Sequence, residues 1–253
     1  MKLSDTALRA PVIVGPGRVG RSLAAAALES GVEVELRDRA AGVDGLDGRT
    51  VLLCVPDAEI RPLADRIGET EQRPALVGHT SGASSLEALA GAAAAASFSV
   101  HPLQTVPDGE TDLTDCPAAI AGSSKDALEV AGELARITGM RPFVVADEDR
   151  VTYHAAASIA SNFLVTLEQT AAGLLADVVE GDPREILEPL VRRSLENWLD
   201  RGALALTGPI ARGDESTVDA HRAALAGRWP ELVGFYDALA ERTREVAAEG
   251  SRR

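Results

Sequence analysis

Residues 12–20 read VIVGPGRVG, an apolar run followed directly by a turn that fits the pattern G-x-G-x-x-G. A helix-like stretch comes next, and this order of strand, turn and helix is typical of a dinucleotide-binding turn. Gly15 would permit the tight turn, Gly17 would let the backbone approach a pyrophosphate, and Gly20 would let the helix pack closely on the strand. The alternative is a purely structural turn. We expect a nicotinamide dinucleotide to bind to Gly15, Pro16, Gly17, Arg18, Val19 and Gly20.

Around this turn, the first half of the chain alternates short apolar runs with helix-like stretches. The apolar runs are residues 11–14, 32–36, 50–55, 75–78, 97–100, 118–121 and 142–145. Such alternation predicts a parallel sheet covered by helices. After residue 147 only helix-like stretches follow. We therefore predict an α/β fold, with an N-terminal Rossmann dinucleotide-binding domain over residues 1–147 and an all-α C-terminal domain, for substrate binding or dimerisation, over residues 148–253.

The composition of the 253 residues narrows the class of partner. A net charge of −14 favours neither nucleic acid nor an anionic membrane surface. No apolar run approaches the ~18 residues that a membrane span needs, and the N-terminus lacks the pattern of a signal peptide. The two cysteines, Cys54 and Cys116, suit a reducing compartment. We expect a cytoplasmic protein with a small-molecule substrate, without a nucleic-acid partner, a membrane partner or a metal.

The end of the second apolar run bears on the identity of the cofactor. It reads Leu36-Arg37-Asp38-Arg39. An acidic residue at this place hydrogen-bonds the ribose 2′-hydroxyl of NAD, whereas an arginine accommodates the 2′-phosphate of NADP. Arg37 and Arg39 favour NADP, and Asp38 keeps NAD open.

Three further strand ends carry polar residues, and ligands of doubly wound sheets bind at the carboxyl ends of the strands. These ends read Val55-Pro56-Asp57, HTSG (residues 79–82) and HPLQ (residues 101–104). The alternative for His79 and His101 is that each caps a strand or bonds the local backbone. We predict that Val55, Pro56 and Asp57 contact the cofactor and that Ser81 and His101 contact the substrate.

The first helix-like stretch of the second half carries a polar stripe. His154, Ser158 and Asn162 recur every four residues, so they lie along one side of a helix. Alanines surround them, which would let a cofactor or substrate approach the helix closely. The alternative is a helix that packs on the nucleotide-binding domain through small residues.

The motifs VIVGPGRVG, LLCVPD, HTSG, SVHPLQ, YHAAASIASN and LTGPIARGD together carry a family resemblance. From about residue 9 to residue 240, the chain resembles the two-domain Rossmann-like oxidoreductases of the 6-phosphogluconate dehydrogenase-like superfamily. Ketopantoate reductases are the nearest in function, and prephenate dehydrogenase and deazaflavin-dependent NADP reductase are more distant. The resemblance implies a homodimer formed through the helical domain.

In ketopantoate reductases and β-hydroxyacid dehydrogenases, the first long helix after the nucleotide domain carries a catalytic lysine and then two asparagines. By resemblance, His154 stands at the lysine position, and Ser158 and Asn162 stand at the asparagine positions. The only lysines of this chain are Lys2 and Lys125, neither in this helix. His154 is therefore the expected proton donor, since imidazole exchanges protons near neutral pH.

The same resemblance assigns the segment LTGPIARGD to the substrate. It makes Thr207 and Arg212 candidate ligands, with Arg212 forming a bidentate pair with a carboxylate. The resulting hypothesis is an NADPH-dependent oxidoreductase that reduces a small 2-oxo acid, with ketopantoate as the first candidate. One alternative is a non-catalytic NADP-binding or sensing protein. Another, suggested by His101-Pro102, is an enzyme like prephenate dehydrogenase.

Overall fold

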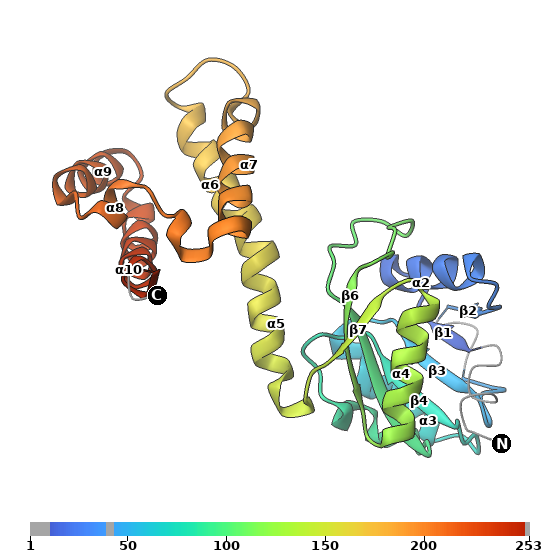
Figure 1. Cartoon of the computed structure of the whole chain (residues 1–253). Coiled ribbons are helices and arrows are strands. Elements are labelled where there is room, and N and C mark those ends of the chain that lie inside the picture. Colours follow the sequence, from blue (N-terminus) through green and yellow to red (C-terminus); the bar gives the residue numbers. More distant parts are fainter. Residues whose placement is uncertain (1–10, 39–42, 251–253) are drawn as a thin grey trace. The chain divides into compact units, whose positions relative to one another are not determined.

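The structure is a computed structural model, and it describes residues 11–38 and 43–250. The chain divides into two compact units, the first ending at Leu164 and the second beginning at Val165 (Figure 1). Among the described residues, no helix is both long and apolar enough to cross a membrane.

A seven-stranded sheet forms the centre of the first unit, in the order β2-β1-β3-β4-β5-β6-β7. The strands are β1 (Val12–Val14), β2 (Glu35–Arg37), β3 (Thr50–Leu53), β4 (Leu76–His79), β5 (Ala96–Pro102), β6 (Pro117–Gly122) and β7 (Arg141–Val144). Neighbouring strands are parallel, except that β6 runs antiparallel to β5. No helix separates β5 from β6, so the chain has no crossover that would bring β6 back parallel. The predicted Rossmann-like fold is confirmed, with a mostly parallel sheet.

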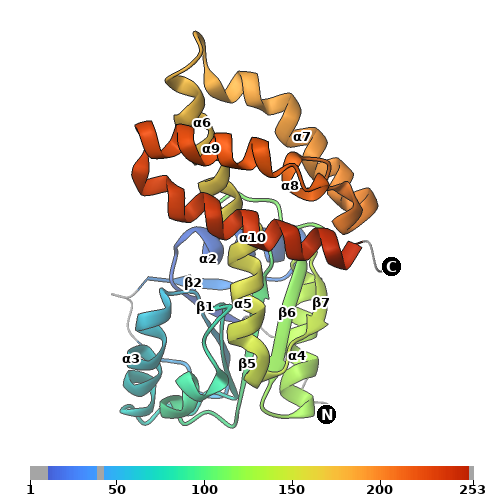
Figure 2. The same cartoon turned by 90° about the vertical axis from the view of Figure 1, so that its left-hand side faces the viewer.

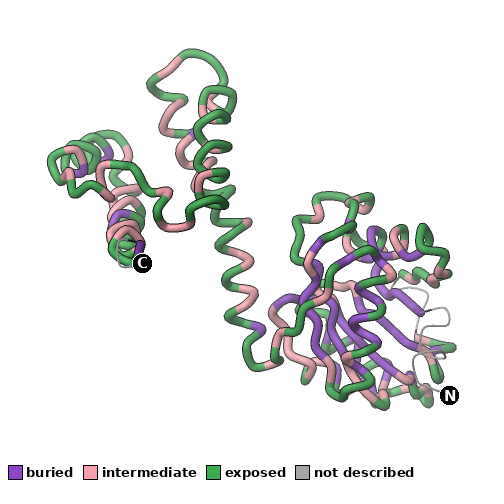
Figure 3. Tube along the Cα trace, in the orientation of Figure 1, coloured by how far each residue is buried: buried purple, intermediate pink, exposed green. Residues whose placement is uncertain are grey.

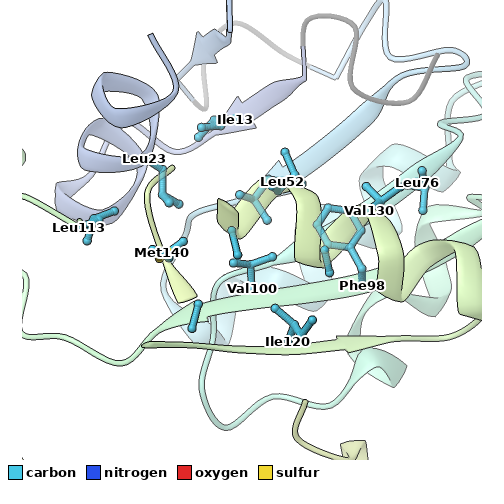
Figure 4. Packing of buried hydrophobic residues seen from close by; sticks show 14 of the residues in the cluster. Ile13, Leu23, Leu52, Leu76, Phe98, Val100, Leu113, Ile120, Val130 and Met140 are labelled. Carbon is cyan, nitrogen blue, oxygen red and sulfur yellow. The ribbon is translucent and has the colours of Figure 1, made fainter. Parts of the chain in front are cut away.

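Helices cover both faces of this sheet because side chains alternate along each strand. On one face, Ile13 and Leu52 pack with α2 (Arg18–Glu29) and α4 (Lys125–Ile137) (Figure 4). On the other face, the cluster holds the strand residues Val12, Val14, Val51 and Leu53, and it packs on α3 (Asp57–Gly68) and the 3₁₀ helix η1 (Leu86–Ala92). Figure 2 shows α3 and α4 on opposite sides of the strands.

The start of η1 is capped by a residue from a distant segment. Ser84 and Glu87 have the spacing of a capping box, but η1 begins after Ser85 and no serine side chain caps it. The backbone N–H of Leu86 instead donates to the carboxylate of Asp147, at 2.9 Å to Oδ1. A charged acceptor from a distant segment thus takes the place of a local cap.

The expected long helix after residue 147 is divided into several pieces. A 3₁₀ turn, η2 (Asp147–Asp149), leads into α5 (Arg150–Ser158), a π-helical turn η3 (Ile159–Phe163) and α6 (Leu164–Ala176). The first compact unit ends at Leu164 and so includes α5 and η3. The domain boundary predicted from the sequence lies near residue 147, where strands give way to helices, and it remains a prediction.

The described part of the second unit is entirely helical, as predicted. It comprises the end of α6, then α7 (Pro183–Arg201), η4 (Gly202–Ala205), α8 (Pro209–Arg212), α9 (Glu215–Arg228), η5 (Pro230–Leu232) and α10 (Val233–Gly250). Asp182 caps α7 by accepting a hydrogen bond from the N–H of Arg184, and Pro189 lies inside this helix. Buried residues concentrate in the strands of the first unit, and the helices of the second are mostly half-buried or exposed (Figure 3).

Replacing two glycines of the turn by alanine should have different effects on the free energy of unfolding. A Cβ added at Gly20 would lie 2.1 Å from the carbonyl oxygen of Gly15, whereas a Cβ at Gly17 would meet nothing within 4 Å. Despite the better helix propensity of alanine, Gly20→Ala should therefore lower the free energy of unfolding by about 1–3 kcal/mol. Gly17→Ala should change it by less than about 0.5 kcal/mol. Urea unfolding measures both, and equal stabilities of the two variants would contradict the packing described here.

Candidate functional site

Two hollows lie at the carboxyl edge of the sheet, both within the first unit. The smaller, of 280 Å³, lies beside the glycine turn and is lined by Arg18, Val19, Asp57, Thr80, Ser81, Gly82, His101, Pro102, Gln104, Val106 and His154. The larger, of 620 Å³, runs along α5 and is lined by His101, Leu103, Gln104, Thr105, Tyr153, His154, Ala156, Ala157, Ser158, Ala160, Ser161 and Asn162. His101, Gln104 and His154 line both hollows, so these side chains form the wall that the hollows share.

The glycine turn leaves the N-terminus of α2 open. Gly17 precedes the helix, no side chain caps it, and its first turn holds no acidic residue. The carbonyl oxygen of Pro16 accepts a hydrogen bond from Nε of Arg21 at 2.8 Å. The N–H groups at this helix end are therefore uncapped, which suits them to bind a phosphate, although Asp57 lines the same hollow.

At the end of β2, the side chain of Arg37 already has hydrogen-bond partners within the protein. Nε of Arg37 donates to a carboxylate oxygen of Glu35 at 2.5 Å, and its Nη1 donates to the carbonyl oxygen of Asp44 at 2.6 Å. Arg49 pairs with the same carboxylate, and both arginines lower the pKa of Glu35. A ribose phosphate that paired with Arg37 would thus compete with Glu35. Arg39 lies outside the described residues.

The shared wall is built on contacts between two histidines and Gly82. The rings of His101 and His154 meet edge to face, with centroids 5.9 Å apart. A Cβ added at Gly82 would lie 2.5 Å from Cδ2 of His154 and 2.8 Å from Nε2 of His101. Only glycine at this position lets both rings approach the loop that follows β4.

Tyr153 holds the other side of the His101 ring. Its hydroxyl oxygen lies 2.7 Å from Nδ1 of His101. Burial, together with the nearby His154 and Arg150, lowers the pKa of His101 to about 4, while Asp57 acts in the opposite direction. His101 is therefore a neutral imidazole near neutral pH, which can donate or accept a hydrogen bond but carries no charge.

A buried arginine fixes the helix that carries Tyr153 and His154. The side chain of Arg150 is fully buried. Its Nη1 donates to Oγ of Ser99 at 2.7 Å, and its Nη2 donates to the carbonyl oxygen of Ser81. Burial lowers the pKa of this guanidinium, while Asp147 and Asp57 act in the opposite direction. The start of α5 is thereby tied to β5 and to the loop after β4.

His79 serves the core and does not line either hollow. It is fully buried at the end of β4, and neither ring nitrogen makes a well-formed hydrogen bond with a described residue. Burial and Arg150 lower its pKa to about 4, against the smaller opposite effects of the Ser85 backbone and Asp57. His79 is therefore a buried residue of the core that is neutral near neutral pH.

The structure brings several of the predicted residues together. His101, His154, Ser158 and Asn162 line the larger hollow, and Arg18, Val19, Asp57 and Ser81 line the smaller one. Oγ of Ser81 also accepts hydrogen bonds from the backbone of Ala83 and Ser84. Val55 and Pro56 precede α3 without lining either hollow. Thr207 and Arg212 lie in the second unit, where the guanidinium of Arg212 donates to the carbonyl oxygen of Thr207.

Sequence reasoning missed Arg150, Tyr153, Gly82 and Ser161. Arg150 follows three acidic residues, a pattern that favours an exposed ion pair over burial. Ser161 lies in the π-helical turn, and both it and Asn162 line the larger hollow. A π turn holds more residues than an α turn, so the strict four-residue stripe widens there, and such turns are frequent at functional sites. Across the described residues, no group of His, Cys, Asp and Glu is arranged to hold a metal.

The buried His79 makes stability depend on pH. An ordinary histidine titrates at pH 6.5, so between pH 6.5 and about 4 the unfolded chain binds a proton that native His79 does not. The free energy of unfolding should therefore be maintained above pH 6.5 and fall as the pH drops toward 4, by up to about 3 kcal/mol from this group. Urea unfolding at pH 7 and pH 4.5 should show a smaller loss for His79→Gln than for the unaltered protein.

The exposed His221 provides the matched control for that measurement. His221→Gln should leave the loss between the two pH values as it is in the unaltered protein. An equal loss in the unaltered protein and in His79→Gln would contradict the assignment of the buried neutral ring.

The fold is similar to that of several solved structures. A protein from Bacteroides fragilis, proposed to be an NADP oxidoreductase, is 22% identical with a TM-score of 0.77, and the match covers 94% of this chain and 98% of that one. A protein from Thermotoga maritima is 23% identical with a TM-score of 0.76, covering 96% and 100%. Prephenate dehydrogenase from A. aeolicus, in complex with hydroxyphenyl propionate and NAD⁺, is 16% identical with a TM-score of 0.56, covering 94% and 98%. These likenesses show that the chain shares its two-part fold, a Rossmann-like sheet followed by helices, with these proteins.

Comparison with the curated proteins gives no match. A family model does match, over residues 116–243, from β6 into α10. Its description is domain of unknown function DUF2520. Because the match covers more than half of the chain, this protein belongs to the DUF2520 family.

Proposed function

We propose that this protein is an NADP-dependent oxidoreductase that reduces the carbonyl group of a small 2-oxo acid, with ketopantoate as the first candidate. The observation that carries the proposal is that His101 and His154 line both hollows. The smaller hollow adjoins the glycine turn, and the larger one is lined by hydroxyl, amide and imidazole groups. A cofactor in the first and a substrate in the second would meet at these two rings.

The residues at the glycine turn fit a dinucleotide. Gly17 leaves open space, and the uncapped N-terminus of α2 offers N–H groups to a pyrophosphate. Arg18, Val19 and Asp57 line the adjoining hollow. Arg37 at the end of β2 supports NADP, and its pairing with Glu35 keeps NAD as the alternative.

A bound nicotinamide dinucleotide supplies or accepts hydride. The residues of the protein would polarise the substrate oxygen, transfer a proton to it and hold the substrate in place. We assign the proton transfer to His154, which stands beside His101 in the shared wall. Ser158 and Asn162 then position the substrate from α5 and the π turn. Ser81 can still donate its hydroxyl hydrogen, because its oxygen only accepts in the hydrogen bonds of its own turn.

The assignments in the second unit rest on the family resemblance. Arg212 and Thr207 stay predicted ligands of the substrate carboxylate, and a homodimer formed through the helical unit stays a prediction. Several large apolar side chains of α7 support the dimer, since Leu190, Trp198 and Leu199 are 64%, 57% and 69% exposed.

A second candidate is oxidation in the manner of prephenate dehydrogenase. The pair His101-Pro102 at the end of β5 and the fold shared with the A. aeolicus enzyme favour it. The rival from another class is a protein that binds NADP without turnover. Assays of NADP⁺ reduction with hydroxy acids, and of NADPH oxidation with carbonyl compounds, separate these three functions.

Binding of the dinucleotide is tested at Gly17. Gly17→Ala should weaken NADPH binding at least tenfold, since the added methyl occupies the space that a pyrophosphate needs. Titration of NADPH fluorescence measures it, and NADH titrated in the same way should bind the unaltered protein less tightly than NADPH. Unchanged affinity in the folded Gly17→Ala variant would exclude the glycine turn as the binding site.

Catalysis is tested at His154. With NADPH and a panel of 2-oxo acids that includes ketopantoate, His154→Ala should lower kcat by about 10²–10⁴-fold, the usual contribution of a proton donor. Lys125→Ala, at the exposed start of α4, is the control and should keep the activity. Full activity of His154→Ala would remove His154 from the mechanism, and tight NADPH binding without any turnover would favour the non-catalytic rival.

A further inference from the structure

We propose that Tyr153 is a positioning residue that holds His101 in the tautomer with its hydrogen on Nε2. In that form His101 is a fixed hydrogen-bond donor toward the substrate oxygen and not a base. The catalytic meaning of this inference rests on the proposed function, whereas the tautomer itself does not.

The contact between the two side chains is well defined. The hydroxyl oxygen of Tyr153 lies 2.7 Å from Nδ1 of His101, and the rings meet edge to face with centroids 5.6 Å apart. Phe143 of β7 packs against the phenol ring at 6.0 Å. Tyr153 is the fourth residue of α5, whose first residue is the buried Arg150. The phenol is thus held from both the sheet and the helix.

The chemistry of the two groups decides the direction of this hydrogen bond. Burial raises the pKa of Tyr153 to about 12 and lowers that of His101 to about 4, so both side chains are neutral at pH 7. Each then has one polar hydrogen, and only one of the two hydrogens can lie in the bond between them. A phenol hydroxyl is the stronger donor and the unprotonated nitrogen of a neutral imidazole is the stronger acceptor, so the phenol donates to Nδ1.

The remaining hydrogen of His101 then sits on Nε2, and the structure shows where this atom faces. Nε2 lies 2.8 Å from the position of a Cβ at Gly82, beside the ring of His154. This is the wall that the two hollows share. A preset donor at that place would stabilise negative charge on the substrate oxygen. The two histidines therefore have different roles: His101 donates a fixed hydrogen bond to the substrate oxygen, and His154 transfers the proton.

The second unit contains a matched pair. Nδ1 of His221 lies 2.9 Å from the hydroxyl of Tyr236, and the ring centroids are 5.9 Å apart. Tyr236→Phe therefore removes the same kind of hydrogen bond away from the proposed site. It serves as the control for Tyr153→Phe.

The experiment is nitrogen NMR of the histidine rings in the full-length protein at pH 7. The chain has four histidines, so single His→Gln variants assign each ring. For His101 we expect Nδ1 at the chemical shift of a nitrogen without hydrogen and Nε2 at that of a nitrogen with hydrogen. In Tyr153→Phe, both shifts of His101 should move toward those of a tautomer mixture, and in Tyr236→Phe they should not move.

A hydrogen on Nδ1 of His101 in the unaltered protein would overturn the proposal, and so would unchanged His101 shifts in Tyr153→Phe. The unaltered protein decides the tautomer even if Tyr153→Phe does not fold. Failure of the proposed function is a separate result. In that case the expected tautomer would be found, but no carbonyl compound would be reduced.

Discussion

The guanidinium of Arg150 occupies a fully buried position at the edge of the sheet, where it donates to Ser99 and to the carbonyl oxygen of Ser81. These bonds join β5, the loop after β4 and the first residue of α5. The side chains of Tyr153 and His154 follow one turn later on the same helix, which places them against His101. The arrangement of the hollows thus depends on one buried cation and its two acceptors.

The same cation influences the histidines around it. A positive charge in a region of low dielectric opposes the protonation of nearby groups, in addition to the cost of burial itself. Both His79 and His101 are affected, and each has a pKa of about 4. The edge of the sheet therefore presents neutral imidazoles near neutral pH. A neutral ring is suited to orient a polar substrate through hydrogen bonds, because its single N–H can be fixed by a partner such as Tyr153.

Local sequence patterns were sufficient for the sheet and the glycine turn. Strands buried on both faces give apolar runs, and the close approach at Gly20 demands a residue without a side chain. His101 was identified because strand ends are readable from the sequence. The bond between His101 and Tyr153 was not, since it joins residues 52 positions apart. Arg150 could not be identified either, because its burial depends on the tertiary position of α5.

Two other differences have the same origin. The cap of η1 comes from Asp147, 61 residues away, so the local spacing of Ser84 and Glu87 was misleading. The π-helical turn at Ile159–Phe163 interrupts the α-helical period, and the four-residue spacing of the polar residues did not predict it. For the candidate site, the sequence was enough to identify His101 and His154, whereas their contacts with Tyr153 and Gly82 are visible only in the structure.

The most direct test of the account is a crystal structure of the protein soaked with NADPH. We predict the pyrophosphate on the N–H groups at the start of α2 and the nicotinamide ring against His101 and His154. A dinucleotide bound away from the glycine turn, or a nicotinamide ring that contacts neither histidine, would contradict the account.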